Sequence, residues 1–309
     1  MRGRLSIAVS VLAALLWAVP VIGAAHSFSS APTVTSQVIK FRVDRDRGLI
    51  VEGWLNGRGP FIFVIDTGAG MNLVSRQLVN AAGLSTSASR PAMIGGLSRS
   101  VVSSTRQAII TSLAVGTPGS VVATNKTAVV VESLPPGVDG ILDPAHTFDS
   151  TAFLIDMPRR TLEITNTPQL NDLGSEGALV EWLASDASDR PFVKLGDGRI
   201  ALIDTGSRFG LAVNSRQAIV LENRSSKGGR VVPTIDVGGG TIIARRVAPT
   251  TISIGELVLR GIPTDILSGI SDDAPLILGR DALLPFRITF DTQRRLIAFA
   301  ASERQRAAR

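Results

Sequence analysis

Short apolar runs that end in turn residues recur along most of the chain. One such run covers residues 60–65 and another covers 200–203, and both are rich in Ile, Val and Leu. A Gly-containing turn signal precedes each run, at 56–57 and at 196–198. Apolar runs of this length between turn signals are typical of buried strands. The pattern predicts a mainly β protein.

Helical spacing is restricted to a few short segments. Residues 76–82 place Leu78, Val79 and Ala82 on one face, after Ser75 as an N-cap and before Gly83 as a stop. We expect a second helix to begin at Ser215 and a third, short one over 280–284. The helices are therefore expected to be minor additions to the sheets.

The N-terminal segment has the features of a targeting signal. Arg2 and Arg4 precede an uncharged apolar stretch over 5–25, which contains Pro20 and ends in small residues. This order predicts a signal peptide over 1–25, and hence a periplasmic or secreted protein. The alternative is an uncleaved membrane anchor formed by residues 5–25. Residues 26–37, rich in Ser, Ala and Thr, are expected to form a flexible lead-in.

The order of sequence landmarks in the first half is repeated in the second half. In each half a strand-like run ends in Asp-Thr-Gly, and then come Ser-Arg-Gln, a second apolar run, and an Asp followed by Arg-Arg. The two sets lie at 66–68, 75–77, 140–142 and 156–160, and at 204–206, 215–217, 276–278 and 291–295. This period is too long for a solenoid and predicts a duplication.

The repeat fixes the expected domain organisation. An N-terminal lobe would cover 38–165 and a C-terminal lobe 176–300, joined by a polar linker at 166–175. Residues 301–309 carry three arginines and are expected to form a solvated basic tail.

Composition removes several classes of catalyst. The 309 residues include no Cys and no Tyr, and the two histidines are His26 and His146. A thiol nucleophile and a His- or Cys-rich metal site are therefore excluded, and no metal or cofactor is expected. A Ser-His-Asp hydrolase would depend on His146, which we expect at the surface or in a loop, and no G-x-S-x-G accompanies it. Carboxylates remain as the main catalytic candidates.

The positive net charge does not indicate nucleic-acid binding. The formal charge is +6, and much of the excess lies at the two ends of the chain. No aromatic residues interleave with the basic tail, as they do in many nucleic-acid-binding segments. We expect no nucleic-acid partner, and contact with a membrane only if the N-terminal segment stays uncleaved.

Two Asp-Thr-Gly copies at matching places are not expected by chance, which would give well under ~0.1 copies in a chain of this length. With this pair, the sequence resembles the aspartic peptidases, and the retropepsin-like group more than pepsin. Residues 276–284 resemble the closing segment of retroviral-type proteases, and residues 90–97 resemble their Gly-tipped flap. The resemblance implies two retropepsin-like β-barrel lobes with short helices, related by a pseudo-twofold axis and fused in one chain.

The resemblance also implies the site and the activity, namely endopeptidase cleavage of an extended peptide or protein by a monomer. Two carboxylates that share one proton can supply both the base and the acid for amide hydrolysis. The implied catalytic residues are Asp66 and Asp204. The implied supporting residues are Thr67, Gly68, Thr205 and Gly206, and the implied flap residues are Met93, Ile94, Gly95 and Gly96.

Two positions depart from the family pattern. Asp143 stands where the family has Gly, which predicts a distortion of the first lobe. Arg208 lies two residues after Gly206, and a cation beside Asp204 would hold that carboxyl ionised. These departures keep two alternatives open: a catalytically silent peptide-binding relative, and lobes that become active only as a homodimer.

Overall fold

The computed structural model describes most of the chain. The described residues are 36–98, 101–171, 173, 177–185, 188–222, 231–235 and 240–301. The predicted signal peptide, the lead-in before residue 36 and the basic tail after residue 301 lie outside them. Among the described helices, none has the length and apolar character needed to cross a membrane.

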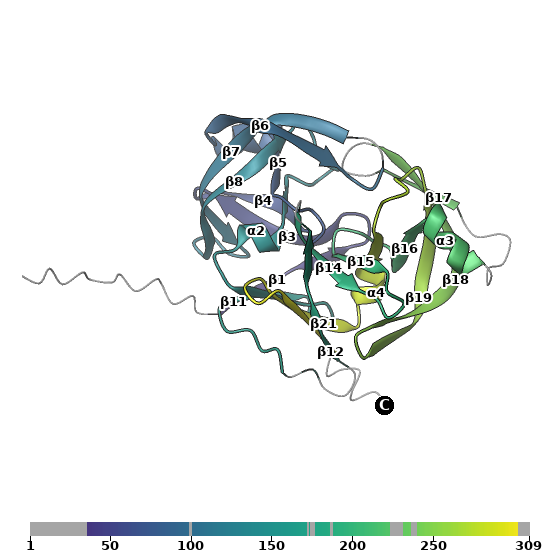
Figure 1. The fold of residues 1–309 in the computed structure, drawn as a ribbon. Coiled ribbons are helices and arrows are strands. Elements are labelled where there is room, and N and C mark those ends of the chain that lie inside the picture. The colour runs from purple at the N-terminus through teal and green to yellow at the C-terminus, as the bar shows by residue number, and fades with distance from the viewer. Residues whose placement is uncertain are drawn as a thin grey trace, which may run out of the picture. The chain divides into compact units, whose positions relative to one another are not determined.

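The mainly β prediction is confirmed, because strands dominate the described residues and form three sheets (Figure 1). The first, here called the N-terminal sheet, has eight strands in the order β2-β3-β4-β9-β5-β8-β7-β6. Its strands are β2 (Arg42–Asp44), β3 (Gly48–Leu55), β4 (Arg58–Ile65), β5 (Leu73–Ser75), β6 (Thr86–Gly95), β7 (Val101–Val115), β8 (Val121–Val131) and β9 (Gly140–Leu142).

The second sheet, here called the C-terminal sheet, also has eight strands, in the order β13-β14-β15-β20-β16-β19-β18-β17. Its strands are β13 (Leu183–Ser185), β14 (Ser188–Lys194), β15 (Ile200–Asp204), β16 (Leu211–Asn214), β17 (Val231–Ile235), β18 (Thr241–Ile254), β19 (Leu257–Ser268) and β20 (Leu276–Gly279). The two strand orders correspond position by position.

The corresponding positions include the strands that carry the Asp-Thr-Gly motifs. β4 leads into the first motif and pairs in parallel with β9, with Ile65 opposite Leu142. β15 leads into the second motif and pairs in parallel with β20, with Ile203 opposite Leu278. Both motifs therefore follow a buried strand that is held by the apolar run the sequence places after it.

The third sheet, here called the shared sheet, joins strands from both halves of the chain. Its order is β1-β11-β10-β21-β22-β12, with strands β1 (Gln37–Lys40), β10 (Ala152–Asp156), β11 (Thr161–Thr165), β12 (Ala178–Glu181), β21 (Phe286–Asp291) and β22 (Leu296–Ala301). β10 and β21 pair antiparallel at its centre, where Phe153 lies opposite Phe290. These two rings are buried and stack with centroids 4.6 Å apart, and Trp182 meets Phe290 edge-on. The halves thus share one aromatic core.

The predicted helix after the first motif is confirmed. α1 spans Arg76–Ala82, the Ser75 hydroxyl accepts a hydrogen bond from the Leu78 amide, and Gly83 ends the helix in the left-handed region at φ 61°. Helices α3 (Ser215–Glu222) and α4 (Arg280–Leu283) begin where the sequence predicted them.

One short helix was not predicted. α2 spans Pro144–Thr147 and begins after Asp143, whose carboxylate accepts a hydrogen bond from the Ala145 amide. His146 therefore lies in a helix, and it is exposed, as the expectation of a surface position required. Pro144 at the first helical position suits this start, because its missing amide hydrogen would have had no partner there.

Candidate active site

The two Asp-Thr-Gly turns face each other at close range. A Cβ atom added at Gly68 would lie 2.6 Å from the Asp204 Cγ atom, and one added at Gly206 would lie 2.6 Å from the Asp66 Oδ1 atom. Neither position has room for a side chain, so each glycine lets the opposite carboxyl group approach. The predicted residues Asp66 and Asp204, far apart in sequence, are brought together by this packing.

A reciprocal set of hydrogen bonds joins the two turns. The Thr67 hydroxyl donates to the Ile203 carbonyl at 2.7 Å, and the Thr205 hydroxyl donates to the Ile65 carbonyl at 3.1 Å. Each hydroxyl also accepts from the backbone amide of the other threonine, at 3.1 Å in both cases. Both threonines are buried. The hydroxyls are thus satisfied only across the interface between the turns, which fixes the position of the aspartates that precede them.

The two carboxyl groups have unequal surroundings. Burial and the nearby charge of Asp204 raise the pKa of Asp66 well above its usual range. Burial also raises the pKa of Asp204, but hydrogen bonds from the Ser207 and Gly206 amides and the charge of Arg280 act against that rise. Two adjacent carboxylates resist ionising together. The unequal surroundings favour Asp66 as the protonated member of the pair and Asp204 as the ionised one.

Asp66→Asn should make the protein more stable than the wild type at neutral pH. Because the folded-state pKa of Asp66 is raised, its contribution to stability is present below the unfolded value of 3.8 and is lost as pH rises through the folded pKa. Asn does not titrate, so the Tm advantage of the variant should grow from pH 4 to pH 8, to about 3 °C or more. Calorimetry across this range measures it, with the exposed-site variant Asp273→Asn as the control. A Tm difference that stays constant with pH would contradict the assignment.

The cation at Asp204 is Arg280, and not Arg208 as the sequence suggested. Arg280 is 3% exposed, and its Nη1 atom donates to the Thr205 carbonyl at 3.0 Å and to the Gly206 carbonyl at 2.8 Å. Its Nη2 atom donates to the Arg45 carbonyl at 2.7 Å. The guanidinium therefore supports the second turn from behind. Arg208 instead places its Nη1 atom 3.2 Å from the Asp46 Oδ1 atom.

Asp143 does not distort the strand beside the first turn. The parallel pairing of β4 with β9 continues to Leu142, whose carbonyl accepts a hydrogen bond from the Asp66 amide at 3.0 Å. The reason is backbone geometry: Asp143 has ψ 111°, whereas its counterpart Gly279 has ψ −173°. A Cβ atom at Gly279 would lie 2.5 Å from the Phe209 carbonyl oxygen, so glycine is needed at this position in the second half, whereas the first half accepts Asp143 there.

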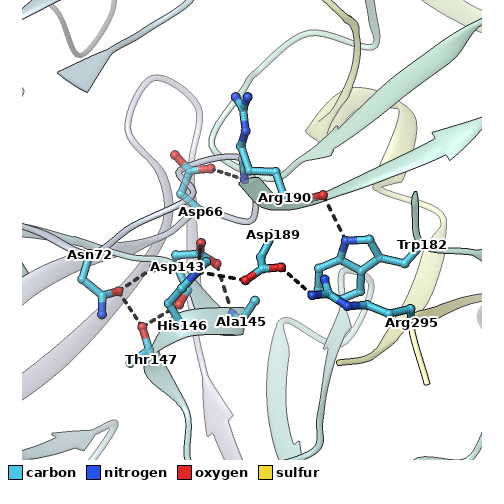
Figure 2. Close-up of polar contacts among 11 residues, drawn as sticks. Asp66, Asn72, Asp143, Ala145, His146, Thr147, Trp182, Asp189, Arg190 and Arg295 are labelled. Carbon is cyan, nitrogen blue, oxygen red and sulfur yellow. Dashed lines mark hydrogen bonds and ion pairs between the residues drawn. The ribbon is translucent and has the colours of Figure 1, made fainter. Parts of the chain in front are cut away.

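Polar contacts hold Asp143 rigidly beside Asp66 (Figure 2). The Asn72 side-chain oxygen accepts from the Asp143 amide at 3.0 Å and from the Thr147 hydroxyl at 2.7 Å. The buried Asp143 carboxylate lies 2.7 Å from the His146 Nδ1 atom. This contact raises the pKa of His146, and the Asp143 charge contributes to the raised pKa of Asp66.

His146 extends this cluster to the second half of the chain (Figure 2). Its Nε2 atom lies 3.6 Å from an Asp189 carboxylate oxygen, and the same carboxylate pairs with Arg295. Arg295 in turn lies over the Trp182 ring, 5.3 Å from its centroid. This series of contacts therefore links Asp143, which lies beside Asp66, to Trp182, which packs against Phe290 of the shared sheet.

A cavity of about 560 Å³ lies at the two Asp-Thr-Gly turns, with Asp66 in its lining. Its lining includes Asp66, Gly68 and Gly206, together with the predicted flap residues Met93, Ile94, Gly95 and Gly96. β6 and β7 form a hairpin in which Gly95 pairs with Val101, so the predicted flap is one arm of a long β-hairpin. Ile94 is buried, whereas Met93 is 62% exposed. The two neighbouring side chains therefore face opposite sides of the hairpin.

The end of this hairpin contacts the C-terminal half. Leu97 packs against a buried apolar cluster that contains Phe209, Ile242 and Ile270. Ser98 forms an isolated antiparallel bridge with Ile270. The hairpin therefore closes the cavity from above, with its end resting on the far wall.

Sequence reasoning missed three residues at this site. Arg280 directly follows β20, and a basic residue next to this buried apolar run was a usable signal of a buried charge. Asn72 and Arg190 gave no such signal. Asn72 matters because it contacts Asp143, and Arg190 because it lines the cavity, and both relations arise only in the folded chain.

Comparison with known families gives one match, over part of the chain. Residues 51–142 match the family model described as aspartyl protease. The matched segment starts in β3, includes the first Asp-Thr-Gly turn and the hairpin, and ends with β9. No curated protein matches the chain. The family match supports an aspartyl protease family and, in general terms, a peptidase.

Proposed function

We propose that this protein is an exported aspartic endopeptidase that hydrolyses peptide bonds with the dyad Asp66 and Asp204. The observation that carries the proposal is the reciprocal packing of the two Asp-Thr-Gly turns, in which each glycine makes room for the opposite aspartate. The threonine hydrogen bonds and the overlying cavity support it.

In the proposed reaction the two aspartates have different roles. Asp204, ionised, removes a proton from a water molecule, and the water oxygen attacks the carbonyl carbon of the peptide bond. Asp66 donates its proton to the carbonyl oxygen, which gives a tetrahedral intermediate. Asp204 then returns its proton to the amide nitrogen, the C–N bond breaks, and Asp66 regains a proton from the collapsing hydroxyl group. The larger rise of the Asp66 pKa supports the assignment of Asp66 as the acid and Asp204 as the base.

The proposed substrate is an extended peptide bound beneath the hairpin. Met93, Ile94, Gly95 and Gly96 would act as the flap, offering backbone groups to the peptide and excluding water. The corresponding strand orders of the N- and C-terminal sheets support a duplication and two retropepsin-like lobes. Because both turns come from one chain, the proposed enzyme is a monomer.

The test is a cleavage assay on the mature protein, residues 26–309, with a denatured protein as substrate. The assay runs from pH 3 to pH 8, with and without a transition-state analogue directed at aspartic peptidases. We expect cleavage that the analogue abolishes. Analogue-insensitive cleavage, or none at any pH, would refute the proposed activity.

The silent peptide-binding relative remains the second candidate. Asp143 favours it, because an additional carboxylate near Asp66 differs from the family pattern and pushes the pKa of Asp66 upward. That candidate binds the analogue without cleaving any peptide. Calorimetric titration with the analogue therefore identifies it when the cleavage assay shows no activity, because a protein without a peptide-binding site would not bind the analogue.

Gly96→Val should slow turnover without unfolding the protein. Gly96 lines the cavity, so a branched side chain there would occupy substrate volume and stiffen the hairpin. We expect kcat/KM to fall about tenfold while the free energy of unfolding changes by less than about 1 kcal/mol. Ile109→Val, on the exposed side of β7, is the control and should leave kinetics unchanged. Wild-type kinetics in Gly96→Val would remove the hairpin from the proposed site.

A further inference from the structure

The short helices that follow β9 and β20 carry different basic residues. In the second half Arg280 is the first residue of α4, and its guanidinium supports the second turn from behind. In the first half the matching position, after Asp143, is Pro144, and the basic residue of α2 is His146. Arginine stays charged at any pH that a folded protein experiences, whereas histidine titrates near neutrality. The first half therefore has a titratable group where the second half has a permanent charge.

His146 lies between two carboxylates that come from different halves of the chain. Its Nδ1 atom lies 2.7 Å from an oxygen of Asp143, and its Nε2 atom lies 3.6 Å from an oxygen of Asp189 (Figure 2). A neutral imidazole has one N–H group and can face only one of them with a donor, whereas the imidazolium presents an N–H group to both. The hydrogen bond to Asp143 accordingly raises the pKa of His146. The side chain is 37% exposed, so protons reach it from solvent.

The other charged groups near His146 do not reverse this preference. Lys126 of β8 acts against the charged imidazole, but it pairs with Asp149 at 2.8 Å. Asp189 pairs with Arg295, and this hydrogen bond lowers the pKa of Asp189, which keeps its carboxylate ionised near neutral pH. The two carboxylates that face the imidazole therefore outweigh the lysine, whose charge is already balanced.

Asp143 brings the charge of this pair close to the dyad. It is 1% exposed and directly follows β9, whose last carbonyl accepts a hydrogen bond from the Asp66 amide at 3.0 Å. After burial and the charge of Asp204, the charge of Asp143 contributes to the raised pKa of Asp66. Arg190 also lies beside Asp66 in Figure 2, but its charge does not change with pH. An imidazolium against Asp143 offsets the carboxylate charge, and a neutral imidazole does not. The protonation of His146 therefore alters the field at Asp66.

Resting on the proposed function, we propose that His146 is a positioning residue whose charge, held against Asp143, controls how firmly the catalytic Asp66 retains its proton. While His146 is protonated, it offsets the Asp143 charge and Asp66 ionises more readily. Once His146 loses its proton, Asp143 acts on Asp66 without that offset, and Asp66 keeps the proton that it donates to the peptide carbonyl. The pair therefore extends cleavage to a higher pH than the same dyad would reach without Asp143.

The first measurement is the pH profile of kcat/KM on one uncharged peptide, in which the alkaline limb reports the ionisation of Asp66. His146→Arg supplies a permanent cation and His146→Gln supplies none. The limb of the Arg variant should lie about 0.5 pH unit or more below that of the Gln variant, with wild type at or between the two. Damage to α2 alone would lower kcat/KM in both variants without separating their limbs.

Asp143 has its own variant and a matched control. Asp143→Asn keeps a side chain that can cap α2, and it should move the alkaline limb below that of wild type. In this background the two His146 variants should differ by less than half as much, because the carboxylate that holds the cation is gone. Asp156→Asn is the control: Asp156 is equally buried and pairs with Arg159 at 3.4 Å, and its loss should not move the limb.

Thermal stability tests the same coupling without any cleavage. The Tm advantage of Asp66→Asn over its parent should grow with pH and level off at the folded-state pKa of Asp66. In the His146→Arg background it should level off at a lower pH than in the His146→Gln background. If the protein cleaves no peptide, this series alone decides the inference. Equal level-off pH values in the two backgrounds would overturn the role of His146 and leave the proposed peptidase activity untouched.

Discussion

Asp66→Asn and Asp204→Asn should each reduce peptide cleavage by at least about 10³-fold. Each substitution removes one of the two roles in the proposed step: Asp66 supplies the proton to the carbonyl oxygen, and Asp204 removes one from water. Asn has nearly the same shape as Asp, so the hydrogen bonds from the Gly68 amide to Asp66 and from the Ser207 amide to Asp204 can persist. The measurement is kcat/KM on one peptide for both variants, with circular dichroism to check folding.

The double variant sharpens this test. Groups that act as one unit are not additive, so Asp66→Asn/Asp204→Asn should be no slower than either single variant. Asp46→Asn, at the exposed edge of the cavity, should retain cleavage of an uncharged peptide and is the matched carboxylate control. Near wild-type activity in Asp204→Asn, with loss in Asp66→Asn, would contradict the single-chain dyad. It would favour two chains that each contribute Asp66, the homodimer alternative.

Thr67→Val should destabilise the protein by about 2–4 kcal/mol and abolish measurable cleavage. Valine matches threonine in shape but cannot donate to the Ile203 carbonyl or accept from the Thr205 amide, so two buried groups lose their partner. The aspartates are positioned through these bonds, so their approach should loosen as well. Urea unfolding gives the free energy, and the peptide assay gives the activity.

Thr67→Ser is the control for this substitution, since it retains the hydroxyl and loses only a methyl group. It should cost about 1 kcal/mol or less and keep most activity. The double variant Thr67→Val/Thr205→Val should lose less than the sum of the singles, because the four hydrogen bonds form one network. If Thr67→Val matches Thr67→Ser in stability, the cross-turn bonds are not what holds the two motifs together.

The sequence was informative wherever the determinants are local. The helix Arg76–Ala82 followed from a cap, a stop and three apolar residues, all within nine positions. The two motifs and their strands followed from a repeated order of landmarks, without any knowledge of their contacts. Local signals of this kind are reliable because the residues that produce them are neighbours along the chain, whatever the rest of the fold.

The charges around the site could not be predicted in this way. Arg208 lies near Gly206 in sequence, yet its side chain pairs with Asp46, whereas Arg280 comes from a distant helix to support the second turn. Asp143 looked incompatible with its position, but a different ψ turned it into the cap of α2. In each case the outcome depends on side-chain direction and on strands that meet only in the folded state.

The shared sheet has a consequence for how the molecule moves. Its central strands β10 and β21 come from different halves, and the stacked rings of Phe153 and Phe290 are buried there, so hinging the halves apart would expose this aromatic core. Domain opening of that kind is therefore costly. The hairpin, by contrast, contacts the far wall, among the described residues, through Leu97 and an isolated bridge at Ser98. The shared sheet is thus the stiff part of the molecule and the hairpin the part most readily displaced, so in the proposed enzyme we expect the opening of the hairpin to set an upper limit on turnover.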